Sequence, residues 1–456
     1  MPRSTAPTPS QDAIDKLKEV NVPVESLLDA CRACGHDCDD DDDDDHVDGY
    51  PKGFDVDLES EMLGGIQAYG RQILISTGKA NWEREVTDVK GSLAQLVKDE
   101  HESRLHLALG TNSSSDSQPK SSSSTSSSGS FLNRLASKFS STSISSQPPS
   151  SAPSSSSSSS STPPHPEPIA LPPGVHPTLS SSITSSGPTS ERLSILTSSF
   201  VSHARDPSHH SVMVFPDYKV VHDVEPSKDK AKEVVERYLG QDVGREGKPP
   251  QRSLAASSSS SLKSWPLPYR AVVLLCSHKT RDKRCHIAAP LLAHQFHHHL
   301  EKHDLVVDES GEGLDEGVAI EDYVDRDEEG GGQGEEERAV EAEEERSDST
   351  NERRTREKLD DVLRGISNGE SGHGGGHDEP GRVGLFKVSH IGGHRYAGNV
   401  IVYFPNGSSV WYGRVTPADV GVIVDRTIMN GKVIPEFLRG GLGLDGKNGA
   451  KGILEW

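Results

Sequence analysis

The sequence lacks any long apolar run. No uninterrupted stretch approaches the roughly 20 apolar residues that a membrane-spanning helix needs, so we expect no membrane partner. The N-terminal stretch MPRSTAPTPSQDAIDK has no apolar core of the kind that a secretory signal requires. These two absences predict a cytoplasmic protein. Because disulfides are rare in that reducing compartment, a disulfide is a poor default for its cysteines.

The sequence also has fewer basic than acidic residues. The chain has 48 Lys and Arg against 70 Asp and Glu, which gives a formal net charge of -22. Phosphate backbones repel such a surface, so we expect no nucleic-acid partner.

Hydrophobic residues make up only 32% of the 456 residues, too few for the whole chain to form packed cores. Residues 111–189 are rich in serine and proline, and residues 308–382 are acidic and rich in glycine. Both compositions predict disordered inserts. Residues 1–50, which include a segment rich in cysteine and aspartate, are expected to form a disordered N-terminus.

The remaining residues form two blocks with the same order of patterns. In each block a strand precedes two strands around a Phe-Pro turn, and a helix follows. The matching segments are RQILISTG, VMVFPDYKVVHDV and SKDKAKEVVERYLGQ in the first block, and AVVLLC, NVIVYFPNGSSVWYGRV and TPADVGVIVDRTIMNG in the second. The pattern predicts an α/β protein with two thioredoxin-like halves, residues 51–110 with 190–250 and residues 262–307 with 383–456.

Two of the five cysteines, Cys276 and Cys285, stand in the stretch CSHKTRDKRC after a predicted buried strand. The glycine-rich stretch SHIGGH, further along the same block, contains His390 and His394. Two thiolates and two imidazoles can hold zinc or a [2Fe–2S] cluster, and the ligand types alone do not choose between them. The cysteine spacing is that of neither a zinc finger nor a C-x-x-C redox pair. Buried thiols with two surface histidines are the alternative.

The stretch CRACGHDC brings together the other three cysteines, Cys31, Cys34 and Cys38. Three thiols at this spacing can bind zinc or a second cluster, and the run of aspartates that follows favours a cation. We interpret them as flexible thiols, with a second metal site as the alternative.

At these motifs the chain resembles the sucrase/ferredoxin-like family. The matching segments are YPKGFDVDLESEMLGG, RQILISTGKANWEREVTDVKGSLA, VMVFPDYKVV, LPYRAVVLLCSHKTRDKRCHIAAPLL, SHIGGHRYAGNVIVYFPNGSSVWYGRVTP and NGKVIPEFLRGG. The resemblance implies a thioredoxin-like ferredoxin domain with a [2Fe–2S] cluster held by two cysteines and two histidines. Carried over to this sequence, the ligands are Cys276, Cys285, His390 and His394. No carboxylate pair supports the sucrase of the family name.

The sequence ends in Leu454, Glu455 and Trp456. This ending looks like the C-terminal tripeptide by which the cytosolic iron–sulfur assembly targeting complex recognises some client proteins. An aromatic ring beside a free carboxylate is a good anchor for a pocket on a partner. A terminal Trp that packs on its own domain is the alternative.

Taken together, the residues and the resemblance predict an iron–sulfur protein that transfers one electron to or from an unidentified redox partner. The remote nitrogens of histidine ligands would allow coupling to a proton. This is an electron carrier rather than an enzyme, with a role in redox or metal homeostasis or in actin patch organisation. The alternatives are a zinc-stabilised interaction module and a thioredoxin-like dithiol oxidoreductase.

Overall fold

The computed structural model describes residues 11–27, 29, 49–111, 171–177, 192–240, 262–317, 319–321, 381–446 and 452–455. The chain divides into one unit of residues 1–106 and 169–456 and a second unit of residues 107–168. Of the second unit the structure describes only residues 107–111, at the end of a helix. The sheet and the candidate site both belong to the first unit.

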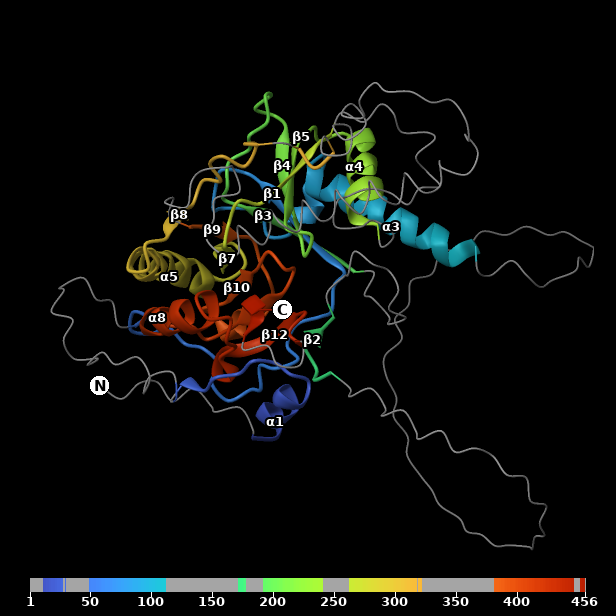
Figure 1. The fold of residues 1–456 in the computed structure, drawn as a ribbon. Coiled ribbons are helices and arrows are strands. Elements are labelled where there is room, and N and C mark those ends of the chain that lie inside the picture. Colours follow the sequence, from blue (N-terminus) through green and yellow to red (C-terminus); the bar gives the residue numbers. More distant parts are fainter. Residues whose placement is uncertain are drawn as a thin grey trace, which may run out of the picture. The chain divides into compact units, whose positions relative to one another are not determined.

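A mixed sheet of 12 strands organises the first unit (Figure 1). The strands pair in the order β2-β12-β11-β10-β7-β9-β3-β1-β4-β5-β6, and β8 pairs with β9 outside this path. Their bounds are β1 (Arg71–Ser76), β2 (Val175–His176), β3 (Leu193–Ser198), β4 (His210–Phe215), β5 (Lys219–Val224), β6 (Ser264–Pro266), β7 (Ala271–Cys276), β8 (Val306–Asp308), β9 (Arg382–Val388), β10 (Val400–Tyr403), β11 (Ser409–Tyr412) and β12 (Leu438–Leu442).

The described helices are few and stand beside this sheet. They are α1 (Gln11–Glu19), α3 (Leu93–Thr111), α4 (Lys228–Val234), α5 (Lys283–Glu301) and α8 (Val420–Val422), of which α4 and α8 continue as π-helical turns over Val235–Leu239 and Ile423–Ile428. Short 3-10 turns cover Val86–Asp88, His394–Tyr396, Pro417–Asp419, Pro435–Phe437 and Ile453–Glu455. The predicted α/β class is therefore confirmed. Among the described helices, none has the length and apolarity needed to span a membrane.

Two sets of four strands share one order and one set of directions. In the first strand group, β3-β1-β4-β5, β1 is parallel to β3 and antiparallel to β4, and β4 is antiparallel to β5. The second strand group, β9-β7-β10-β11, repeats these directions with β7 in the place of β1. The groups meet at β3 and β9, where Ser389 N donates to Thr197 O and Ser199 N to Lys387 O, both at 2.9 Å.

The strands and helices predicted for both blocks are present, although the closing helix of the second block is 3-10, α- and π-helical in turn. One helix boundary differs by a full turn. The helix expected from IAAPLLAHQFHHHLEKH begins earlier, at Lys283, because the Asp282 carboxylate caps it and accepts from Arg284 N at 2.9 Å. As a result Cys285 lies inside the first turn of α5. The predicted cap at Thr416 is confirmed as a capping box with Asp419, whose carboxylate accepts from Thr416 N at 2.9 Å.

One face of the sheet carries a core that both strand groups share, and the opposite face carries a separate core for each. Along β7, Val272 and Leu274 enter the shared core, whereas Val273 and Leu275 pack under α5. Along β1, Leu74 enters the shared core, and its two isoleucine neighbours pack with residues of α3 and α4. This alternation follows from the two-residue period of a strand.

The N-terminal helix α1 differs from the sequence expectation of a disordered N-terminus over residues 1–50. Its apolar positions Ala13 and Leu17 lie four residues apart, on one face, and are buried. Beyond the helix, Val22 is also buried, and Glu25 N donates to Val433 O at 2.9 Å. The tertiary contact compensates for a helix too short to be stable alone.

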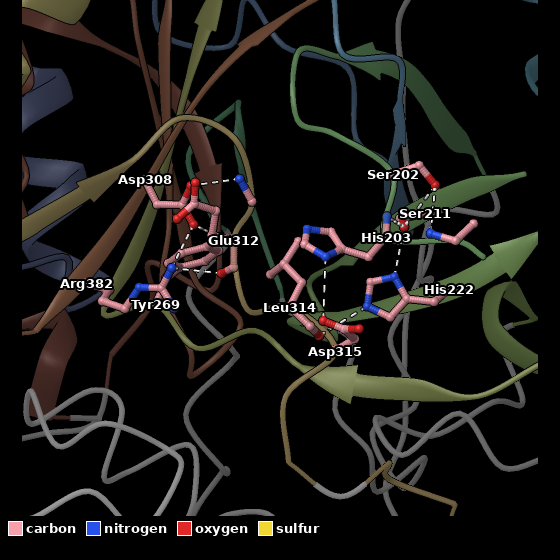
Figure 2. A network of polar contacts seen from close by, with 12 residues as sticks. Ser202, His203, Ser211, His222, Tyr269, Asp308, Glu312, Leu314, Asp315 and Arg382 are labelled. Carbon is pink, nitrogen blue, oxygen red and sulfur yellow. Dashed lines mark hydrogen bonds and ion pairs between the residues drawn. The ribbon is translucent and has the colours of Figure 1, made fainter. Parts of the chain in front are cut away.

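The chain after β8 packs back onto the first strand group (Figure 2). Asp308, the last residue of β8, accepts from the Tyr269 hydroxyl at 2.8 Å. Beyond it, Ser310 O accepts from Val201 N at 2.8 Å, and Leu314 O lies 3.1 Å from Nε2 of His222. Ile320 is buried as well. The packed chain thus reaches Glu321, past residue 308, at which the sequence places the start of the acidic insert. The later part of that insert and most of the serine-rich insert lie outside the described residues.

Candidate functional site

The fold brings Cys276 and Cys285 together. Cys276 is the last residue of β7, and Cys285 is the third residue of α5, so the connecting loop returns the chain to the end of the strand. Both thiols are buried, with Ala397 beside them, and neither forms a disulfide. The side chains of the two cysteines are hydrogen-bonded to each other.

The two thiols differ in acidity because they share a proton. The hydrogen bond from Cys285 holds the pKa of Cys276 well below its usual value, and His390 and the Ile391 backbone act in the same direction against the effect of burial. The pKa of Cys285 is raised, first by its bond to Cys276 and then by burial. The buried pair therefore favours a single negative charge, on Cys276, and a soft metal would bind both sulfurs as thiolates.

The histidines come from a loop whose backbone favours glycine. Gly392 and Gly393 have φ angles of 82° and 66°, the left-handed region that side chains disfavour. The loop sets the rings of His390 and His394 with their centroids 5.5 Å apart. Nδ1 of His390 is buried and, among the described residues, has no hydrogen-bond partner. A metal ligand needs a nitrogen that no hydrogen bond occupies, and Nδ1 of His390 is such a nitrogen. These residues therefore fit a metal or a cluster.

His278, within CSHKTRDKRC, is a residue of the site that the sequence analysis missed. It is buried, its Nδ1 accepts from His390 N at 3.2 Å, and its Nε2 lies 3.2 Å from Trp82 O. These partners assign the proton to Nε2, because Nδ1 must accept. The Thr280 hydroxyl also donates to Trp82 O, at 2.7 Å. The loop after β1 therefore supports the cysteine loop, a contact that no local pattern could indicate.

The four predicted ligands share one neighbourhood, but the structure does not show them as a formed ligand set. In the part of the chain that the structure describes, no group of three or more His, Cys, Asp or Glu side chains is arranged to hold a metal ion. The assignment of Cys276, Cys285, His390 and His394 as ligands therefore stays a prediction.

The other predicted sites fall largely outside the described residues. Cys31, Cys34 and Cys38 are not described. Of the C-terminal residues, Leu454 is partly buried against the core of the second strand group, whereas the side chains of Glu455 and Trp456 are not described.

The family model for sucrase/ferredoxin-like proteins matches residues 62–440. This range takes in both strand groups, the cysteine loop and the glycine-rich loop. The chain belongs to the sucrase/ferredoxin-like family. The predicted resemblance is thus confirmed for most of the sequence.

Curated relatives match over shorter segments. A segment of 56 residues is 59% identical to Altered inheritance of mitochondria protein 32 of Debaryomyces hansenii and covers 12% of this chain and 20% of that protein. A segment of 161 residues is 29% identical to Actin patches distal protein 1 of Saccharomyces cerevisiae and covers 35% of this chain and 30% of that protein. The chain thus matches less than a third of the length of either relative. No solved structure matches it.

Proposed function

We propose that this family member is an iron–sulfur electron carrier whose cluster is held by Cys276, Cys285, His390 and His394. The observation that carries the proposal is the hydrogen-bonded, buried thiol pair beside an unpartnered, buried Nδ1 of His390. When bound, a [2Fe–2S] cluster takes up and gives back one electron. The family name, sucrase/ferredoxin-like, is consistent with this role.

The residues of the chain would hold and shield the group. Cys276 and Cys285 lie in a buried apolar cluster with Ala397, and Phe54 and Ile391 pack against it, which keeps water from the thiols. His394 is exposed, at the rim of the glycine-rich loop.

Iron, acid-labile sulfide and zinc content of the full chain, purified without added metal, test the proposal. We expect about two irons and two sulfides per chain and a paramagnetic resonance signal after reduction with dithionite. Cys285→Ser and His390→Ala should lose the iron. His286→Ala is the matched control, because His286 follows Cys285 but is exposed. One zinc per chain and no iron would instead support the zinc-stabilised interaction module.

The dithiol oxidoreductase remains the second candidate, since the two thiols are already hydrogen-bonded and one has a lowered pKa. Burial weighs against it: Cys276 and Cys285 are 3% and 1% exposed, and a dithiol that exchanges with another protein must be reachable. Reduction of insulin by the iron-free protein, retained in His390→Ala and lost in Cys285→Ser, would favour this candidate over the electron carrier.

We also propose that each strand group is a thioredoxin-like half, residues 51–110 with 190–250 and residues 262–307 with 383–456. The repeated strand order β3-β1-β4-β5 and β9-β7-β10-β11, each followed by a helix, supports this assignment. An experimental structure in which either group fails to superpose on thioredoxin would refute it.

The C-terminal tripeptide Leu454-Glu455-Trp456 is proposed to bind the cytosolic iron–sulfur assembly targeting complex. The chain is anchored just before it, since Ile453 N donates to Gly431 O and the Asn406 amide to Ile453 O, both at 2.8 Å. Deletion of Trp456 should abolish co-purification with that complex and lower iron content in cells, while iron reconstitution of the purified protein in vitro stays unchanged.

A cytoplasmic location and a role in redox or metal homeostasis or in actin patch organisation complete the proposal. The names of two relatives refer to actin patches and to inheritance of mitochondria. Fractionation of cells that express the tagged full chain tests the location. Recovery in the mitochondrial fraction would contradict the cytoplasmic assignment.

A further inference from the structure

Arg439 on β12 is a buried cation at the candidate site. Its side chain is 1% exposed, and its Nη1 donates to Asn399 Oδ1 at 2.7 Å and to Gly392 O at 3.4 Å. Nη2 donates to Gly65 O at 3.3 Å. The guanidinium thus holds the glycine-rich loop from inside the protein.

Among the described residues, this cation has no carboxylate partner. All of its hydrogen-bond acceptors in the described part of the chain are neutral, and its Nε, although buried, has none. Other buried arginines are paired: Arg71 lies 2.8 Å from Asp217. The guanidinium also lies over the rings of Tyr396 and Trp411, which offset part of its charge. A buried charge that no carboxylate balances is still costly, so an anion is expected beside Arg439.

The negative charge that acts most strongly on Arg439 is that of Cys276. Burial lowers the pKa of Arg439 to about 10, and Cys276 is the largest of the effects that oppose this shift. Asn399 forms a second link, because its carbonyl accepts from Cys276 N at 3.2 Å while its side-chain oxygen accepts from Arg439. The Arg439 guanidinium and Cys276 are therefore connected through Asn399.

The glycine-rich loop is shaped to admit this guanidinium. A Cβ added at Gly393 would lie 2.3 Å from Nη2 of Arg439, so no larger residue fits unless the arginine moves. The Asn399 amide donates to Gly393 O at 3.1 Å and fixes the loop against the same group. Arg439 thereby fixes the main chain between His390 and His394.

We propose that Arg439 is a positioning residue of this site, whose buried charge holds the His390–His394 loop and offsets the negative charge that the site gains with one electron. The inference rests on the proposed function. Because a nearby cation favours the more negative state, Arg439 raises the reduction potential of the bound group.

The test is a potentiometric titration of the purified full chain with dithionite, followed by paramagnetic resonance. Arg439→Gln should favour the oxidised state about tenfold, a potential about 59 mV lower for one electron. Arg439→Lys keeps the charge and should restore most of the wild-type potential. Arg414→Gln is the control: Arg414 is also buried and also lies over the Tyr396 ring, but it binds Asp57 O and Ser60 O.

A second variant covers the case in which Arg439→Gln does not fold. Asn399→Asp places a carboxylate against Nη1 of Arg439 and should lower the potential in the same direction without removing the arginine. A wild type that has the cluster, with an unchanged potential in both variants or an equal shift in Arg414→Gln, overturns the inference alone. A wild type without iron and sulfide overturns the proposed function and the inference with it.

Discussion

The two strand groups have the same backbone frame but different side chains at the same place. At the end of β1, Thr77 N donates to Ser198 O, and at the end of β7, Ser277 N donates to Val388 O, both at 3.0 Å. In this frame Ser76 of the first group stands where Cys276 stands in the second. The backbone places a side chain at this strand end in both groups. Whether that side chain could bind a metal depends on the residue type that each group has there.

The first group nevertheless contributes to the site of the second. The Trp82 carbonyl, on the loop after β1, accepts from Thr280 and lies against His278. One group therefore carries the proposed ligands, and the other contacts the loop that joins two of them.

The difference between the two strand groups is tested most directly at the residue that ends β1 or β7. Cys276→Ser gives the second group the residue of the first and should lose all bound iron, because a neutral hydroxyl is a poor ligand for iron. Ser76→Ala is the control and should leave iron content unchanged. Iron and sulfide analysis of the purified variants measures both. Iron retained in Cys276→Ser would move the ligands elsewhere.

The sequence predicts the strands, the hairpins and the cysteine and histidine loops, because these depend on local patterns. The Asn-Gly turn between β10 and β11 and the cap at Thr416 are of this kind. It does not predict the roles of His278 and Arg439. Their partners lie 112 residues away, at His390, and 40 residues away, at Asn399, and only the fold brings them together.

The position of α1 was missed for a different reason. Its composition is that of a short polar helix, and the aspartate run that follows suggests a disordered tail. Only the core of the second strand group, into which Leu17 packs, makes the helix stable. Tertiary contact overrides local propensity here.

The shared core tests whether the two groups unfold together. Phe386 of β9 is fully buried and lies with its ring centroid 5.7 Å from that of Phe200, which follows β3. Phe386→Ala should lower the free energy of unfolding by about 3–5 kcal/mol, in a single transition. Urea unfolding followed by tryptophan fluorescence measures this, and Phe386→Leu should cost less. Two separate transitions would show that the groups are independent.

The support from the first group predicts a smaller effect on the metal. His278→Phe removes the acceptor of His390 N and the contact with Trp82 O, and should speed loss of iron to a chelator about tenfold. The bleaching rate of the absorption spectrum measures this. His286→Phe, beside Cys285 but exposed, is the control and should match the wild type. An equal rate in all three proteins would mean that His278 only fills space.

The smallest predicted effect concerns a buried histidine of the first strand group. His222 of β5 lies between the Ser211 hydroxyl, 2.8 Å from Nδ1, and Leu314 O (Figure 2). Burial lowers its pKa below 6.5 and outweighs the bond to Leu314 O. The nearby carboxylates Asp315 and Asp223 oppose this effect, and His203 adds to it.

Because the folded state holds His222 neutral, it binds fewer protons than the unfolded chain once the pH falls below 6.5. The stability that His222 contributes is therefore complete above that pH and is lost as the pH drops toward its folded-state pKa. We expect a slope of at most about 1.4 kcal/mol per pH unit from this group. Urea unfolding between about pH 7 and pH 5 should show a smaller slope in His222→Gln than in the wild type. Equal slopes would mean that the network around Leu314 accepts the charged ring, and that acid loosens the first strand group through other residues.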